Sequence, residues 1–361
     1  MWLEGAGTLR DRVTRIEKLV AFLAANLRTS DGTPAVDAAA AATAARVAHL
    51  AKADLATDMI RDGKEFTSLQ GVMGGHYARV GGEPADVAAG IAEHYQPRGP
   101  ADALPATVPG LLVSLADRFD AIAGCFAMGL IPSGSQDPYA LRRAANGIMR
   151  ILLEKEWHLD LSATVAASLA SLPATAFAKE AAPAAVQARI GEFLRDRLDY
   201  HLRESGVPYD VVAATLAAVT TLSQGPVDAR ARATALAAIR GEADLEKLVV
   251  GYKRAANILK GLDDNPPADP SSIAAGDPVE KALHDAWREA DGALRDAIRR
   301  VDYPAAVRLY LGLRAPIDDF FTGVMVNSEV PAEKRRRLGL LGQVRELFDR
   351  LYDLSKIVVE G

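Results

Sequence analysis

Apolar residues recur at three- and four-residue steps through almost the whole chain. In the first segment they form one stripe, made of Leu9, Val13, Ile16, Leu19, Val20 and Leu23. This spacing places side chains on one face of an α-helix. It predicts further helices over Asp37–Ile60, Leu111–Met128, Ala140–Leu153, Ala184–Glu204, Glu242–Leu262, Pro278–Val301, Tyr303–Arg314 and Ala332–Val358. Because no long run alternates apolar and polar residues, we expect an all-α protein.

Glycine, proline and polar runs mark the breaks between these helices. Their density predicts a loop-rich zone over Gly71–Pro109 and an exposed loop at Asp263–Pro267. Pro138 fits the first turn of the Ala140–Leu153 helix, with Asp137 as its N-cap. Composition shifts toward Ala, Ser and Pro after residue 160. We therefore expect three domains, over residues 1–160, 161–241 and 242–361.

Composition and charge restrict the class of protein. The chain has 361 residues, 49% of them hydrophobic and 25% charged, as in ordinary soluble globular proteins. Its net charge of -5 excludes a broadly basic nucleic-acid binder, so any RNA contact must use local Lys/Arg patches. The single cysteine, Cys125, has apolar neighbours and predicts a buried thiol and a reducing, cytoplasmic setting. No apolar run is long enough to predict a membrane span, and no signal peptide is expected.

The sequence lacks the common motifs for binding nucleotides or metals. It has no phosphate-cradling loop followed by Lys-Ser/Thr, and no His-x-x-x-His or Cys-x-x-Cys pair. Two carboxylates, Asp54 and Asp117, lie in apolar helical segments, where an aspartate needs a partner. They could form a metal or phosphate site. The interpretation we favour is capping or ion pairing, with residues such as Arg118 and Arg142.

Basic clusters are the remaining candidates for a binding surface. They are Arg142-Arg143, the pair Lys253-Arg254 that leads to Lys260, and the run Lys334–Arg337. Each could be a solvated helix face, or it could contact RNA phosphates. Tyr252 and Phe320-Phe321 could stack on bases, or could belong to the core.

Several sequence blocks closely resemble the β subunit of bacterial glycyl-tRNA synthetase. The blocks are Lys52–Met59, Glu65–Gly74, His76–Arg79, Glu93–Arg98, Leu115–Asp120 and Gly129–Ala145. Within the last one, Pro132–Arg143 (PSGSQDPYALRR) is highly specific. Later segments agree, at Phe193–Leu198, Val227–Arg230, Tyr252–Lys260, Phe320–Asn327 and Leu338–Leu341. The resemblance covers nearly the whole chain.

The resemblance implies a fold for each part. Residues 1–160 would be similar to the HD fold, which in other proteins holds a metal and hydrolyses phosphates. Residues 161–241 would be a helical linker, and 242–361 a DALR-like anticodon-binding domain of the kind that also occurs in arginyl-tRNA synthetase. The HD activity needs a His, a His-Asp pair and a distant Asp. Here Ala53-Asp54 stands for His-Asp, Asp117 stands for the distant Asp, and no first His matches. The resemblance thus implies a degenerate HD site at Asp54 and Asp117, without a metal.

The resemblance also implies a function. The family's β subunit is longer at its N-terminus, so this chain would be a fragment or an unusually short protein. In the family, a separate α subunit of class II performs glycylation with ATP and Mg, so no catalytic residue and no cofactor is expected here. We expect a chain that positions tRNA-Gly, with tRNA-Gly and the α subunit as partners and neither membrane nor DNA. The alternatives are an HD-type metal-dependent phosphohydrolase or a non-catalytic helical scaffold. The expected tRNA-binding residues are Arg79, Arg142, Arg143, Lys253, Arg254, Asn257, Lys260, Lys334 and Arg337.

Overall fold

The structure is a computed structural model that describes residues 5–61, 64–177, 182–219, 222–260, 273 and 277–359. The described residues form helices joined by turns, with isolated bridges such as Arg28–Pro34 and no β-strand among them. This confirms the all-α prediction. The loop predicted at Asp263–Pro267 lies outside the described residues.

The chain divides into two compact units. Unit 1 contains Met1–His201 and Thr221–Val227, and unit 2 contains Leu202–Thr220 and Asp228–Gly361. Helices α9 (Pro183–Glu204) and α11 (Gly225–Ala238) contribute residues to both units. The division into three domains, at residues 160 and 241, stays a prediction.

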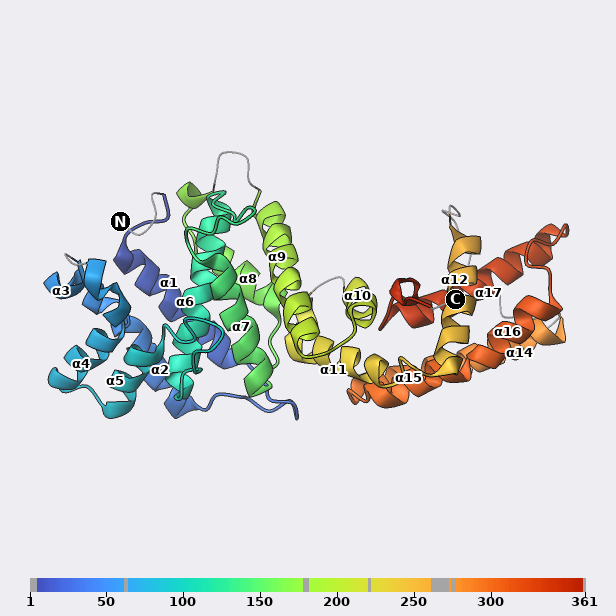
Figure 1. Ribbon diagram of the computed structural model, residues 1–361, viewed down its shortest axis with the longest axis horizontal. Helices are drawn as coiled ribbons and strands as arrows, with labels where there is room; N and C mark the ends of the chain where they lie inside the picture. The colour runs from blue at the N-terminus through green and yellow to red at the C-terminus, as the bar shows by residue number, and fades with distance from the viewer. Residues whose placement is uncertain are drawn as a thin grey trace. The chain divides into compact units, whose positions relative to one another are not determined.

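Unit 1 is built around one buried helix, α6 (Val108–Ala127), which lies between α1 and α7 in Figure 1. Thr107 caps its first turn, because the threonine side chain accepts a hydrogen bond from the Gly110 amide. Nearly every side chain of α6 is buried, so it packs against helices on several sides. These neighbours are α1 (Leu9–Asn26), α2 (Ala38–Leu50), α5 (Ala85–Glu93), α7 (Leu141–Lys155) and α8 (Leu161–Ala170).

The predicted loop-rich zone contains two helices, α4 (Val72–Val80) and α5, so that prediction was wrong in its first half. The two helices pack closely because Gly74 and Gly75 face the contact. A Cβ atom added to Gly75 would lie 2.7 Å from the carbonyl oxygen of Ala88. Here glycine serves close helix packing rather than a turn. Short helical segments precede α4: 3₁₀ helices at Ala53–Ala56 and Lys64–Leu69, and α3 (Asp58–Arg61).

Helix α7 begins later than predicted. Its first residue is Leu141, and Ala140 precedes it with a left-handed φ of 56°, so Pro138 lies outside the helix. Asp137 still caps the helix, because its carboxylate accepts hydrogen bonds from the amides of Leu141 and Arg142 at 2.8 and 3.0 Å. The prediction of Asp137 as the capping residue is therefore confirmed, whereas the prediction of Pro138 in the first turn of the helix is wrong.

Unit 2 contains α10 (Tyr209–Ala218) and a helical bundle (Figure 1). In this bundle α12 (Ala243–Leu259) packs against α15 (Tyr303–Gly312), α16 (Arg314–Gly323) and α17 (Pro331–Asp349). Aromatic side chains fill the centre of this bundle, with the rings of Tyr310 and Phe348 4.7 Å apart. The helix predicted over Tyr303–Arg314 ends at Gly312, and a second helix follows over Arg314–Gly323. The helix predicted over Ala332–Val358 ends earlier, at Asp349, and a 3₁₀ turn follows at Leu354–Lys356. Helix α14 (Pro278–Arg299) also belongs to the bundle and packs against α15, α16 and α17.

Candidate functional site

Four of the predicted tRNA-binding residues lie at the C-terminal end of α12. The helix buries apolar residues such as Leu248 and Leu259 on its inner face. Arg254, Asn257 and Lys260 are exposed, and Lys253 is half-buried. Arg254 and Asn257 lie three positions apart and share one helix face, and Lys260 follows at the C-cap, so the three form an exposed polar strip.

A depression of about 500 Å³ lies beside this strip. Three predicted residues, Lys253, Arg254 and Asn257, line it. The other described lining residues are Val250, Ile258 and Val359, so the described part of the lining contains two cations, one amide and no carboxylate. A concave surface with apolar walls and a few polar groups is a typical ligand-binding geometry.

Neighbouring groups hold the two cations of the depression in place. The ammonium of Lys253 donates a hydrogen bond to the carbonyl oxygen of Ile357 at 2.8 Å. The guanidinium of Arg254 lies 4.4 Å from the ring centroid of Phe321, as in a cation–π contact. Of the aromatics that could have been core or stacking groups, Tyr252 and Phe320 belong to the core, whereas Phe321 is half-buried beneath Arg254.

The cationic run at the start of α17 divides into two pairs. Lys334 and Arg335 are exposed. Arg336 and Arg337 both bind Glu280, a carboxylate on α14 with no exposed surface, and the Arg337–Glu280 distance is 2.6 Å. Arg337 also donates to the carbonyl oxygen of Met325 at 2.8 Å. The run of four cations therefore presents only its first half to solvent.

The remaining predicted cations belong to unit 1. Arg79 is exposed on α4, and Arg143 is exposed on the first turn of α7. Arg142 is half-buried and donates a hydrogen bond to the carbonyl oxygen of Gly134 at 2.7 Å. This contact fastens the Pro132–Arg143 loop to the helix that follows it.

Asp54 and Asp117 are both buried in unit 1. Asp117 pairs with Arg12 and Lys52, each at 2.8 Å, and not with Arg118 or Arg142. Burial acts to raise the pKa of Asp117, but the charges of Arg12 and Lys52 outweigh it and hold that pKa below its ordinary value. Asp54 accepts a hydrogen bond from the amide of Gly71 at 2.7 Å. In the part of the chain that the structure describes, no three His, Cys, Asp or Glu side chains are arranged to hold a metal ion.

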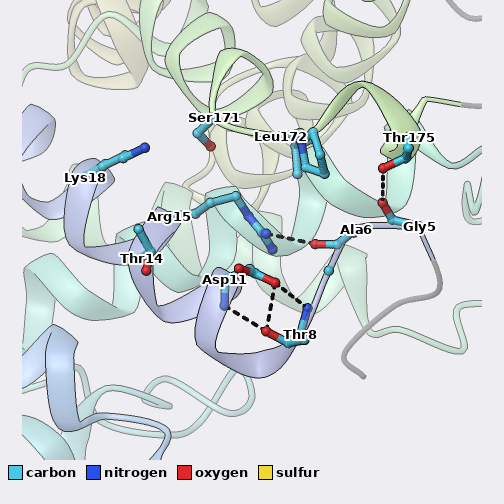
Figure 2. A pocket seen from close by; sticks show the side chains of 12 residues that line it. Gly5, Ala6, Thr8, Asp11, Thr14, Arg15, Lys18, Ser171, Leu172 and Thr175 are labelled. Atoms are coloured by element: carbon cyan, nitrogen blue, oxygen red, sulfur yellow. Dashed lines mark hydrogen bonds between the residues drawn. The ribbon is translucent and has the colours of Figure 1, made fainter.

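A second depression, of about 620 Å³, lies where α1 begins (Figure 2). Its polar groups are largely bonded to one another: the Thr8 amide and hydroxyl both donate to Asp11, and Arg15 donates to the carbonyl oxygen of Ala6 at 2.9 Å. None of the predicted site residues lines it. We read this depression as part of the helix cap.

Comparison with known proteins identifies the family. The family model described as "Glycyl-tRNA synthetase beta subunit" matches residues 1–217. The chain is 37% identical over 360 residues to the glycine–tRNA ligase β subunit of Acidithiobacillus ferrooxidans, covering 99% of this chain and 49% of the relative. It is 40% identical over 365 residues to that of Myxococcus xanthus, covering 100% of this chain and 50% of the relative. The chain belongs to the glycyl-tRNA synthetase β-subunit family.

The chain spans about half the length of these relatives. A third relative, the glycine–tRNA ligase β subunit of Syntrophotalea carbinolica, is 44% identical over 313 residues, covering 86% of this chain and 44% of the relative. Among the described helices of this family member, none is long and apolar enough to cross a membrane.

Some residues of these sites were missed by sequence reasoning. Val359 lines the α12 depression although it lies about a hundred positions after Arg254 in the sequence. Lys52 and Arg12 bind Asp117 from 65 and 105 positions earlier in the sequence. The one signal that pointed to Lys52 was its place between two alanines at the end of an apolar helical segment. A charged residue there needs a partner if the helix end is buried.

Proposed function

We propose that this chain contacts tRNA-Gly and positions it for ATP-dependent glycylation on a separate α subunit of a class II glycine–tRNA ligase. The observation that carries the proposal is the outer face of α12, where Lys253, Arg254 and Asn257 line a depression and the exposed Lys260 follows at the C-cap of the helix. Family membership supports the ligase assignment. The net charge of -5 requires such a local patch, because the whole molecule does not attract RNA.

The residue types on this face match the chemistry of an RNA loop. Lys253 retains N–H donors beyond the one used by Ile357, so it can also bind a phosphate. The guanidinium of Arg254 lies over the Phe321 ring and is exposed, so it can also meet a base or a phosphate. The Asn257 amide can pair with a base edge, and the exposed Lys260 stands at the C-cap of the same helix. We therefore assign phosphate contact to the cations and base contact to Asn257.

The proposed surface does not include Arg336 or Arg337. Their guanidinium groups are committed to Glu280, and freeing them would leave that carboxylate buried without a partner. Lys334 is exposed on the same helix and remains part of the proposal. Arg79, Arg142 and Arg143 remain candidate contacts within unit 1.

The test is the salt dependence of tRNA binding by single neutral variants. Arg254→Gln and Lys260→Gln should each reduce the slope of log K against log salt by about 0.7 if the side chain meets a single-stranded phosphate. Between 50 and 200 mM salt the affinity of each variant should therefore fall about 2.6-fold less than that of the unmodified chain. Fluorescence anisotropy with labelled tRNA-Gly measures the slope directly.

The matched control is Arg299→Gln, which removes an exposed cation from α14 in the same unit. Its slope should equal that of the unmodified chain. If Arg254→Gln and Lys260→Gln also leave the slope unchanged, the α12 cations are an ordinary solvated helix face and the proposed surface is wrong.

A further inference from the structure

Lys52 is a lysine whose ammonium is enclosed in unit 1. It lies in the turn between α2 and the 3₁₀ helix Ala53–Ala56, and only 1% of its surface is exposed. A buried ammonium is strongly unfavourable unless each N–H finds a partner. Its nitrogen lies 2.8 Å from Asp117 Oδ2, 2.9 Å from His94 Nε2 and 3.8 Å from the ring centroid of Tyr95. A carboxylate, an imidazole and an aromatic face together form a complete cage for one cation.

The imidazole is set up to accept a hydrogen bond from Lys52. His94 Nδ1 lies 2.6 Å from the carbonyl oxygen of Ile91, to which it must donate. The proton is therefore on Nδ1, and Nε2 is the acceptor. Burial, with the charge of Lys52 beside it, lowers the pKa of His94 to about 3, so the ring is neutral at physiological pH.

The cage is extended by further ion pairs, in which positive and negative side chains alternate. The second oxygen of Asp117 binds Arg12 at 2.8 Å, and Arg12 also lies 3.4 Å from Asp120. Asp120 in turn binds Arg15 at 2.6 Å. These alternating charges therefore connect α1, the turn after α2, the end of α5 and the middle of α6, which are the elements that form the centre of unit 1.

A divalent metal, which the HD-like resemblance would place near Asp54 and Asp117, does not fit these residues. Asp117 Oδ2 and His94 Nε2, which could donate to a metal, already bind the Lys52 ammonium at 2.8 and 2.9 Å. The guanidinium of Arg12 would face the metal across the same carboxylate. Asp54 directs one oxygen to the Gly71 amide. Two fixed positive charges at one carboxylate oppose a third.

We infer that the ammonium of Lys52 is a built-in cation that does in this unit what a bound metal would do, joining Asp117 of α6 to His94 at the end of α5. The cage is thus a cation site filled from within by the chain itself. When the lysine side chain is cut back, the same cage should take a small primary alkylammonium from solution, whose NH₃⁺ group has the shape and donors of the missing one.

The experiment compares Lys52→Ala and Lys52→Met in the full 361-residue chain. Both variants leave Asp117 with one cation fewer, so the melting temperature of unit 1 should fall by roughly 6–20 °C. Propylammonium chloride should raise the melting temperature of Lys52→Ala, relative to tetramethylammonium chloride at the same concentration. It should not raise that of Lys52→Met, because the methionine side chain fills the space.

Lys18→Ala is the matched control, since Lys18 is an exposed lysine on α1 of the same unit. It should melt like the unmodified chain and should not respond specifically to propylammonium. The metal content of the unmodified chain, measured by inductively coupled plasma mass spectrometry, should be far below one ion per chain, and EDTA should not change its melting temperature.

Three results would overturn the inference. One is a stoichiometric metal in the unmodified chain together with a melting temperature that EDTA lowers. Another is a Lys52→Met variant as stable as the unmodified chain, which would mean that the ammonium contributes nothing. The third is a propylammonium response of equal size in Lys52→Ala and Lys18→Ala. If Lys52→Ala does not fold, Lys52→Met and the metal measurement still decide the question.

Discussion

Replacing Glu280 with glutamine should destabilise unit 2 far more than the same change at Glu333. Both carboxylates bind Arg337, so the two substitutions remove the same kind of ion pair. They differ in solvent exposure. The Glu280 side chain has no exposed surface, whereas that of Glu333 is 37% exposed. The comparison therefore sets a buried carboxylate that binds two arginines against a partly exposed carboxylate that shares one of them.

The expected magnitudes follow from this difference. Glu280 binds both Arg336 and Arg337, whose side chains are only 13% and 10% exposed. Breaking a buried pair leaves an uncompensated charge and costs about 3–5 kcal/mol. Glutamine keeps one acceptor oxygen, so we expect the lower end, about 3 kcal/mol. A partly exposed pair such as Glu333–Arg337 contributes about 0.2–1 kcal/mol.

Hydrogen exchange followed by mass spectrometry in increasing urea measures these losses, because peptides from α14 and α17 report on the two helices that the pair connects. Glu280→Gln should lower the free energy of unfolding of these peptides by at least about 2 kcal/mol more than Glu333→Gln. If the two variants agree within about 0.5 kcal/mol, Glu280 is not a buried structural partner. The division of the Lys334–Arg337 run into exposed and buried pairs would then be wrong.

Three further substitutions test other parts of the structure. Tyr252→Phe removes the hydroxyl that donates to Asp349 at 2.5 Å and should cost about 1–2 kcal/mol in urea unfolding of unit 2. The pKa of His94 is lowered to about 3 in the folded protein, so on acidification the unfolded chain binds a proton at this imidazole before the folded chain does. The free energy of unfolding of unit 1 should therefore fall by up to about 1.4 kcal/mol per pH unit as the pH drops below about 6.5. His94→Gln should flatten that slope. Gly75→Ala should lower the melting temperature of unit 1 because its Cβ would meet the α5 backbone at 2.7 Å, whereas Gly292→Ala, in open space on α14, should stabilise unit 2 by about 0.5–1 kcal/mol. Equal signs for the two glycine variants would contradict the packing argument.

The fold class could be predicted from the sequence because helical periodicity is a local property. The stripe of α1 is an example: Val13, Ile16, Leu19, Val20 and Leu23 are all buried, as their spacing predicted. The thiol of Cys125 is also buried as expected, and burial raises its pKa to about 12.

The errors occurred where a distant contact decides the structure. Gly74 and Gly75 predicted loops, since nothing nearby in the sequence shows that α5 packs against them. The Lys334–Arg337 run looked uniform because Glu280, the partner of its second half, lies more than fifty positions earlier. Partners of this kind are set by the fold, so composition and spacing alone do not reveal them.

The candidate site was predictable to the same extent. One helix and its C-cap carry Lys253, Arg254, Asn257 and Lys260, so helical spacing alone predicts that they lie close together. The depression beside them could not be predicted, because Val359 and Phe321 come from other segments. Neither could the cage around Lys52, whose partners His94 and Asp117 lie on later helices.

A tRNA-positioning role is tested by a binding titration of tRNA-Gly and of an unrelated tRNA against this chain, with the α subunit present and at low salt. We expect tRNA-Gly to bind at least about tenfold more tightly, a difference of about 1.4 kcal/mol, and Arg254→Gln to weaken its binding. Equal affinity for the two tRNAs, with no effect of Arg254→Gln, would contradict a tRNA-positioning role and favour a helical scaffold.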